Sequence, residues 1–147
     1  MSLFFRTQTK RIMAGVLPIG GGAPVSVQSM CCTKTQDTEA LAASISDSAL
    51  AGCDIVRLAV PDMDAARALS VIKERSPLPI VADIHFDHRL AVEAAQRGAD
   101  KIRINPGNIG GAANVARVAK ACSLHNIPIR IGINGGSLEK PLLEKYG

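Results

Sequence analysis

The sequence contains no tryptophan, and aromatic residues make up only 3% of its 147 residues. Proteins that bind single-stranded nucleic acids stack bases on aromatic side chains, so this composition argues against such a partner. A duplex is an equally poor match, because the net charge is only +4 and the lysines and arginines form no run. We therefore expect no nucleic-acid partner. A small anionic ligand suits this mild positive charge better.

Long apolar runs and metal-binding cysteine pairs are missing as well. The sequence shows no signal-peptide core and no segment long enough to span a bilayer, so we expect no membrane association. Its cysteines form no C-x-x-C pair, and they are Cys31, Cys32, Cys53 and Cys122. Cys53 and Cys122 have apolar neighbours and are expected in the core. We expect free thiols in a reducing compartment, the cytoplasm.

Five apolar segments, each followed by a helical pattern, occupy most of the chain. The predicted strands are 24–30, 54–60, 78–86, 101–105 and 127–134. The predicted helices lie near 37–51, 63–75, 88–97, 112–125 and 138–145. Asp37, Asp62 and Asp87 are predicted N-caps, and Gly52 and Gly98 are predicted helix stops. Alternating strands and helices predict a parallel α/β sheet with right-handed crossovers.

The regular spacing of these units is typical of a β/α barrel or a doubly wound sheet. A closed TIM barrel has eight βα units, and this sequence supplies about five. We therefore expect an incomplete barrel from the front part of a longer protein. Before the first strand, segment 11–27 is predicted to form a β-hairpin with its turn at Gly20–Gly22. A hairpin in this position would close the bottom of the barrel.

Polar side chains recur in the C-terminal half of every predicted strand. Residues two apart in a strand share a face, and the shared face carries Gln28, Arg57, Asp83, His85, Arg103, Asn105, Arg130, Gly132 and Asn134. Parallel barrels and open α/β sheets bind ligands at this end of their strands. Burying arginines is costly unless they are paired, and Asp83 can compensate for only one of them.

A multiply charged anion between Arg57, Arg103 and Arg130 explains this arrangement most simply, because guanidinium groups match phosphate oxygens. The glycine-rich turn after the fourth strand, 107–111, would let backbone N–H groups approach such a ligand. Asp83 and His85 allow two interpretations, a metal-binding pair or a hydrogen-bonded pair for acid–base chemistry or orientation. We favour the second and predict no metal site.

Five segments together resemble the 4-hydroxy-3-methylbut-2-enyl diphosphate synthases. They are VQSM (27–30), AGCDIVRLAVP (51–61), PIVADIHFDHRLA (79–91), KIRINPGNIG (101–110) and PIRIGINGGSLE (128–139), and the likeness runs from about Arg6 to Gly147. This resemblance implies an oxidoreductase of the non-mevalonate isoprenoid route. Such an enzyme opens 2-C-methyl-D-erythritol 2,4-cyclodiphosphate reductively to 4-hydroxy-3-methylbut-2-enyl diphosphate.

The same resemblance implies how the complete protein is organised. A TIM barrel holds the substrate diphosphate, and residues 1–147 would be the N-terminal portion of that substrate-binding domain. A separate C-terminal domain, outside this chain, holds a [4Fe–4S] cluster through three cysteines and a glutamate. Flavodoxin or ferredoxin supplies the electrons, and the enzyme is a homodimer. We expect this chain alone to hold no cluster and to be inactive.

Individual site residues are carried over from the resemblance by position. The implied substrate-binding residues are Arg57, Arg103, Asn105, Arg130 and Asn134, and the implied catalytic pair, facing the cyclic substrate, is Asp83 and His85. Cys31 and Cys32 depart from the pattern, because they stand where the resemblance implies small polar residues. We do not assign them as ligands.

Two other classes remain open from the sequence. A barrel enzyme like dihydropteroate synthase also binds a diphosphate-bearing substrate, although the scarcity of aromatics argues against stacking a pterin. A metal-dependent barrel lyase that uses Asp83 and His85 is a variant of this alternative. The second class is a non-enzyme, an anion-binding fragment whose open sheet edge pairs with another copy.

Overall fold

A parallel sheet forms the centre of the computed structural model, which describes residues 9–138 and 140–146. Its five strands lie in chain order, each paired with the next. They are β3 (Gln28–Met30), β4 (Ile55–Ala59), β5 (Ile80–Asp83), β6 (Lys101–Ile104) and β7 (Ile129–Ile131). The predicted parallel α/β architecture is confirmed.

The strands are shorter than predicted, and at β3 all of the lost residues lie at its start. Its predicted start at Pro24 has no N–H to offer a ladder. The N–H of Val27 donates to the Asp54 carboxylate at 2.7 Å instead of to a neighbouring strand. Regular pairing therefore begins only at Gln28, which lies opposite Ile55.

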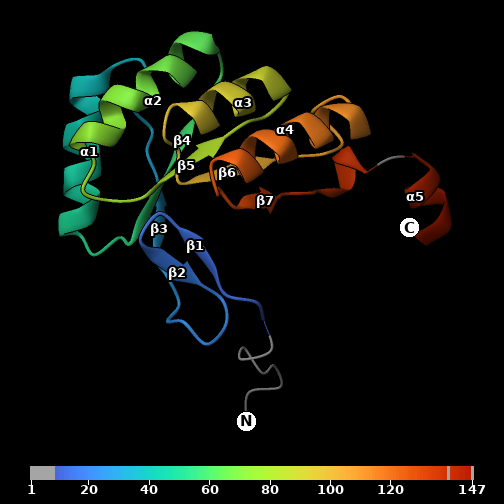
Figure 1. Ribbon diagram of the computed structural model, residues 1–147, viewed down its shortest axis with the longest axis horizontal. Coiled ribbons are helices and arrows are strands. Elements are labelled where there is room, and N and C mark those ends of the chain that lie inside the picture. Colours follow the sequence, from blue (N-terminus) through green and yellow to red (C-terminus); the bar gives the residue numbers. More distant parts are fainter. Residues whose placement is uncertain (1–8, 139, 147) are drawn as a thin grey trace.

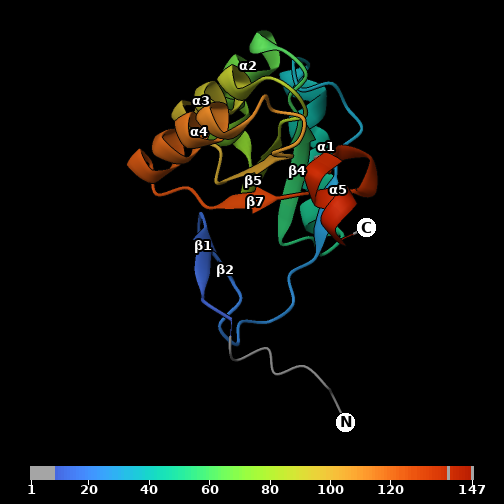
Figure 2. The same ribbon diagram turned by 90° about the vertical axis from the view of Figure 1, so that its right-hand side faces the viewer.

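Four helices cover one face of the sheet (Figures 1 and 2). They are α1 (Thr38–Leu50), α2 (Met63–Arg75), α3 (His88–Gln96) and α4 (Ala112–Leu124). A 3-10 turn (Gly135–Ser137) and the short helix α5 (Lys140–Tyr146) follow β7. Figure 1 shows α5 standing apart from the layers of sheet and helices. The helix bounds agree with the predicted ones to within about two residues.

The predicted caps explain this agreement. Asp37, Asp62 and Asp87 each accept a first-turn backbone N–H, at 3.2, 2.8 and 2.9 Å. Gly52 and Gly98 follow α1 and α3 with φ of +91° and +89°, a conformation that favours glycine. Each cap satisfies backbone groups that a helix end otherwise leaves without partners.

Strand alternation divides the sheet into an apolar face and a polar face. In the β5 segment, Ile80, Ala82 and Ile84 are fully buried against the helices. The intervening residues Asp83 and His85 therefore lie on the opposite face. The large apolar side chains buried in this layer are Leu41, Ile45, Leu58, Leu69, Ile72, Ile102 and Ile104. Burial of that layer fixes which residues each strand presents on its other side.

The N-terminal hairpin, β1 (Ile12–Ala14) and β2 (Leu17–Ile19), lies beneath the sheet (Figure 2). Ala14 packs with Ile55 and Val81 near the N-terminal ends of their strands, so the predicted position at the barrel bottom is confirmed. The predicted turn at Gly20–Gly22 is wrong, because the strands are joined by a two-residue turn that begins at Gly15 (φ +59°). Such short turns require positive φ.

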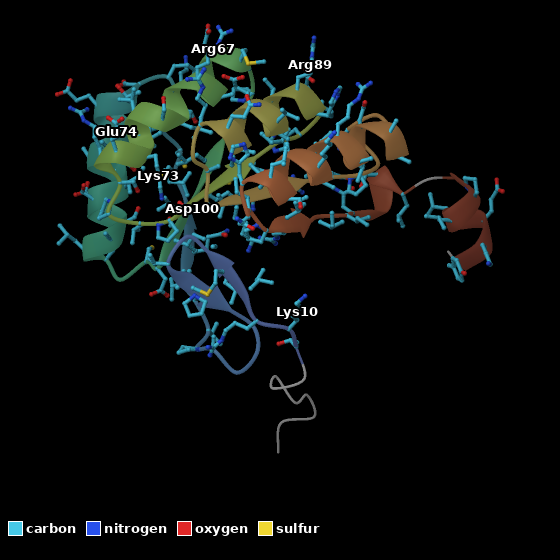
Figure 3. The ribbon with its side chains drawn as sticks, in the orientation of Figure 1. Lys10, Arg67, Lys73, Glu74, Arg89 and Asp100 are labelled. Carbon is cyan, nitrogen blue, oxygen red and sulfur yellow. The ribbon has the colours of Figure 1, made fainter. Side chains whose placement is uncertain are left out.

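Gly20, Gly21 and Gly22 lie just after β2 and also have positive φ, so they redirect the chain toward β3. A polar contact fixes the same end of the sheet: the Lys73 ammonium lies 2.6 Å from Asp100 Oδ2 (Figure 3). The same oxygen accepts the N–H of Ile80 at 2.8 Å.

In the part of the chain that the structure describes, no helix has the length and apolar character needed to cross a membrane.

Candidate functional site

The sheet face opposite the helices collects most of the predicted site residues. The strand register places Asp83 beside Arg103, and Arg103 beside Arg130. Arg57 reaches the same place from β4, where its guanidinium contacts the Asp83 carboxylate. Four successive strands thus supply one charged surface, as the two-residue alternation predicted.

Asp83 is the centre of this surface. Its side chain is fully buried, and each of its oxygens accepts a hydrogen bond from an arginine. Arg57 donates to Oδ2 from Nη2 and Nε, at 2.7 and 2.9 Å. Arg103 donates to Oδ1 from Nη1 at 3.0 Å. One carboxylate therefore orients two guanidinium groups, which are 23% and 18% exposed.

His85 lies beside this carboxylate. Its Nε2 is 3.3 Å from Asp83 Oδ2, and 46% of the side chain is exposed. The neighbouring ring of Phe86 meets the imidazole edge-on, with 6.1 Å between centroids. His85 is thus accessible from the sheet surface, whereas Asp83 is not. The catalytic role of the pair stays a prediction.

Residues 9–138 and 140–146 contain no group of side chains suited to a metal ion. No three histidine, cysteine, aspartate or glutamate side chains of these residues come close enough together to hold a metal ion. The four cysteines are free thiols. The described residues therefore do not fit an iron–sulfur cluster, and they give Asp83 and His85 no third metal ligand.

Among the described residues, no carboxylate contacts Arg130 or Lys101. In this they differ from Arg57 and Arg103. Arg130 is exposed, and no described residue forms a hydrogen bond or ion pair with it. Lys101 is half-buried. Burial lowers the pKa of its amine, and the nearby charge of Arg130 lowers it further. The sequence prediction missed Lys101, although its position two residues before Arg103 places it on the same face.

Asn105 is held between two loops rather than left free at the surface. It is 2% exposed, its Nδ2 donates to Ser137 Oγ at 2.9 Å, and its Oδ1 accepts the N–H of Gly107 at 3.1 Å. Asn134 is exposed, and its backbone N–H donates to the same Ser137 hydroxyl at 3.2 Å. Ser137, which the prediction did not include, joins both. Ligand contacts by either asparagine stay a prediction.

The glycine-rich turn between β6 and α4 presents backbone rather than side chains. Gly110 and Gly111 have φ of +93° and +88°. Gly111 occupies the N-cap position of α4, where it provides no side-chain acceptor for the first helical N–H groups. Binding of an anion by these N–H groups stays a prediction.

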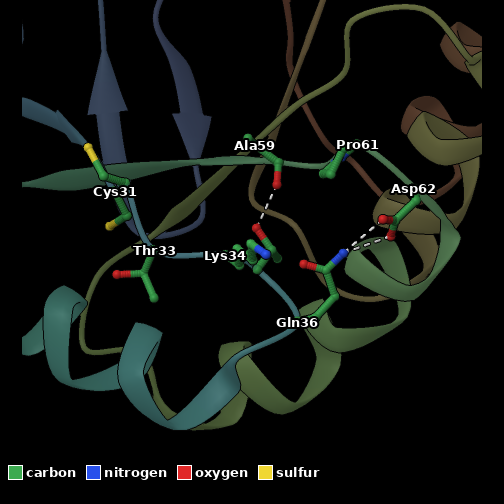
Figure 4. Close-up of a pocket in the computed structure, with 9 residues that line it drawn as sticks. Cys31, Thr33, Lys34, Gln36, Ala59, Pro61 and Asp62 are labelled. Atoms are coloured by element: carbon green, nitrogen blue, oxygen red, sulfur yellow. Dashed lines mark hydrogen bonds between the residues drawn. The ribbon is translucent and has the colours of Figure 1, made fainter.

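A pocket of about 560 Å³ lies beside this face, under the loop that joins β3 to α1 (Figure 4). The Thr35 hydroxyl donates to Ala59 O at 2.5 Å, and Gln36 Nε2 donates to the Asp62 carboxylate at 2.8 Å. These contacts attach the loop to the end of β4. Lys34, also in the lining, is held on a well-anchored backbone.

The adjacent cysteines have different surroundings. Cys31 is 7% exposed and packs with the helices, and burial raises the pKa of its thiol. Cys32 is exposed in the pocket lining. Cys122 is buried as predicted, whereas Cys53 is only half-buried. Only Cys32 among these thiols is freely accessible.

Solved structures share the fold at low sequence identity. Dihydropteroate synthase from Xanthomonas albilineans superimposes with a TM-score of 0.61 at 17% identity, over 92% of this chain and 54% of that one. The enzyme from Stenotrophomonas maltophilia gives 0.57 at 18% identity, over 76% and 43%. At this identity the likeness supports a β/α-barrel fold and carries no functional conclusion.

Curated relatives are much more similar in sequence. Proteins named 4-hydroxy-3-methylbut-2-en-1-yl diphosphate synthase (flavodoxin) are 56% identical in Idiomarina loihiensis, over 97% of this chain and 38% of the relative. In Brevibacillus brevis the identity is 56%, over 99% and 40%. This chain spans about two fifths of the length of these relatives. Residues 9–147 match the family model described as the GcpE TIM-barrel domain, and the chain belongs to that family.

Proposed function

We propose that the chain is the substrate-binding barrel segment of a 4-hydroxy-3-methylbut-2-en-1-yl diphosphate synthase. Its substrate would be 2-C-methyl-D-erythritol 2,4-cyclodiphosphate, which the complete protein would open reductively. The name carried by relatives at 53–56% identity supports this assignment. Their name also supports flavodoxin as the electron donor.

The observation that carries the proposal is the positive charge on the sheet face opposite the helices. Four cations, from β4, β6 and β7, lie on the same face as Asp83, and no other carboxylate of the described residues forms an ion pair with them. Two of them contact Asp83, and the other two, Lys101 and Arg130, have no acceptor among the described residues. A surface with such an excess of positive charge suits a ligand that carries several negative charges. A cyclic diphosphate meets that requirement.

The chain's own residues would bind and orient this ligand. Arg57 and Arg103 are fixed by Asp83, so their remaining N–H groups point in a defined direction and lose little freedom on binding. Arg130 would form its charged hydrogen bonds only with the ligand. His85 lies at the exposed side of the same carboxylate, where it could orient the substrate or transfer a proton.

Electron supply and assembly would belong to the complete protein. We infer a [4Fe–4S] cluster that would supply electrons when bound, held by residues outside this chain, since the described residues do not fit one. We also infer a homodimer in the cytoplasm. On this proposal residues 1–147 hold the substrate, and the isolated chain does not turn it over.

Calorimetric titration of the chain with the cyclodiphosphate tests the proposal. Arg130→Ala should weaken binding by roughly tenfold to a hundredfold, since a hydrogen bond to a charged group is worth about 1.5–3 kcal/mol. It should leave the unfolding free energy within about 0.5 kcal/mol, because no described residue forms a hydrogen bond or ion pair with Arg130. Arg67→Ala, on the exposed side of α2, is the matched control and should bind as the parent does.

Two results would contradict the proposed site. Either a folded chain and the complete protein both fail to bind the cyclodiphosphate, or Arg130→Ala and Arg67→Ala bind it equally well. Binding of inorganic pyrophosphate with no preference for the cyclodiphosphate would instead favour the anion-binding fragment. The alternative of a dihydropteroate-synthase-like activity has no support beyond the shared fold.

A further inference from the structure

Gly132 lies on β7's continuation, directly beneath the guanidinium of Arg103. A Cβ atom added at Gly132 would lie 2.6 Å from Arg103 Nε, 2.8 Å from Nη2 and 3.1 Å from Cζ. Carbon–nitrogen contacts of this length are sterically excluded, so no other residue fits here while Arg103 keeps its position. Three guanidinium atoms occupy the space that a side chain at position 132 would need.

The other side of the same guanidinium is fixed by Asp83. Arg103 Nη1 donates to Asp83 Oδ1 at 3.0 Å, on β5. The Arg103 side chain thus reaches across the sheet face opposite the helices, from β5 to the continuation of β7. Its own strand, β6, lies between them. Gly132 is held in place because its N–H donates to Ile104 O at 2.9 Å. Two rigid contacts on opposite sides leave the guanidinium one orientation.

The backbone of Gly132 does not itself require glycine. Its φ lies outside the positive range that other residues rarely adopt, unlike that of Gly110 or Gly111. An alanine could therefore adopt the same backbone conformation. The atoms that its methyl group would meet are the end of a flexible side chain, not backbone. The requirement for glycine here comes from Arg103 and not from folding.

We propose that Gly132 is a positioning residue for anion recognition. Because Gly132 has no side chain, the Arg103 guanidinium can lie against the sheet at this point and keep its hydrogen bond to Asp83. This inference rests on the proposed function for its ligand. A side chain at position 132 would lift the guanidinium, break its bond to Asp83 and misdirect the N–H groups that face the anion. Anion recognition by the parent chain would thus depend on the absence of a methyl group at position 132.

Pyrophosphate titrations of five forms of the chain test the proposal. They are the parent, Gly132→Ala, Arg103→Ala, the double variant, and Gly135→Ala. Gly135→Ala is the matched control, since a Cβ at Gly135 would meet nothing within 4 Å. We expect Gly132→Ala to weaken binding roughly tenfold and to lower the urea midpoint by no more than Arg103→Ala does, since both changes remove the contact between Arg103 and Asp83. In the Arg103→Ala background the same change should have no effect, because its action passes through Arg103.

The outcomes separate this inference from the proposed function. Parent-like binding by Gly132→Ala, or an equal loss in both backgrounds, would overturn the role of Gly132. If instead Arg103→Ala binds as the parent does, the proposed anion site fails. A readout without ligand covers the case in which Gly132→Ala does not fold. In the isotope-labelled parent, the Arg103 Nε–H should be rigid and slow to exchange, and a signal averaged like that of exposed Arg67 would contradict the proposal.

Discussion

At the scale of single residues, the candidate site depends on one buried carboxylate. Asp83 is fully buried and contacts Arg57, Arg103 and His85. An uncompensated charge in such a position is costly, but here both oxygens accept charged hydrogen bonds. The side chain therefore acts first as the group that fixes two arginines in place. Any chemical role for Asp83 must be compatible with those contacts.

Replacing Asp83 by asparagine keeps its size and removes its charge. We expect the unfolding free energy to fall by about 3 kcal/mol, because two partly buried arginines then lose their common counter-ion. Urea denaturation followed by circular dichroism measures the change. Asp64→Asn is the control, since the Asp64 carboxylate is 83% exposed and its nearest arginine is 3.9 Å away. Equal stability of the two variants would show that Asp83 is not the organising charge.

At the scale of elements, the loop after β6 and the 3-10 turn after β7 form a single unit. Asn105 joins them through Ser137, and the close approach of Gly107 to the Ser137 carbonyl leaves no room for a side chain. The two loops border the charged face on neighbouring strands. Their mutual position therefore decides where Asn134 and the glycine-rich turn lie relative to the arginines.

Gly107→Ala should disturb this unit, because the added methyl group would meet backbone that cannot move as a side chain can. We expect a loss of about 1–3 kcal/mol in unfolding free energy, the usual cost of overpacking. Thermal unfolding of this variant beside Gly135→Ala checks the expectation. Identical midpoints in both variants would mean that the loops are not packed against each other.

At the scale of the whole molecule, β3 and β7 are the ends of the sheet in the part of the chain that the structure describes. Ile131 and Ile133, on and after β7, are 52% and 57% exposed, whereas Ile104 on the neighbouring strand is fully buried. Open strand edges with apolar side chains favour pairing with further strands. Completion of a barrel would cover this edge.

The protonation state of the core thiol Cys122 should affect the stability of the whole fold. Burial raises its pKa from 9.0 to about 11, so the folded state holds this proton more tightly than the unfolded chain does. The resulting stabilisation is complete below about pH 9 and is lost as the pH rises toward 11. Unfolding free energies should accordingly decline over this interval.

Denaturant titrations at several alkaline pH values measure that decline. Cys122→Ala should show a shallower fall than the parent, while Cys32→Ala, at an exposed thiol, should follow the parent. Lys101, whose pKa is lowered, acts in the opposite direction but is common to all three proteins. Parallel curves for the parent and Cys122→Ala would contradict the assigned role of the thiol.

Local patterns in the sequence were sufficient to predict the elements and the polar face. Alternation of apolar and polar residues identified the strands, and aspartate caps with following glycines set the helix bounds, because these signals act between residues close in the chain. The same alternation placed Arg57, Asp83, Arg103 and Arg130 together. The hairpin turn was wrong, because Gly15 and Gly20–Gly22 are locally equivalent turn signals and only strand pairing distinguishes them.

Contacts between strands far apart in the sequence were decided only by the tertiary structure. The chain order does not show that Asp83 binds two arginines at once, that Asn105 is held by Ser137, or that Gly132 lies beneath Arg103. Each of these depends on strand register and on side-chain direction across 20 or more residues of sequence. The sequence by itself determined which side chains share a face, and packing determined which of them meet.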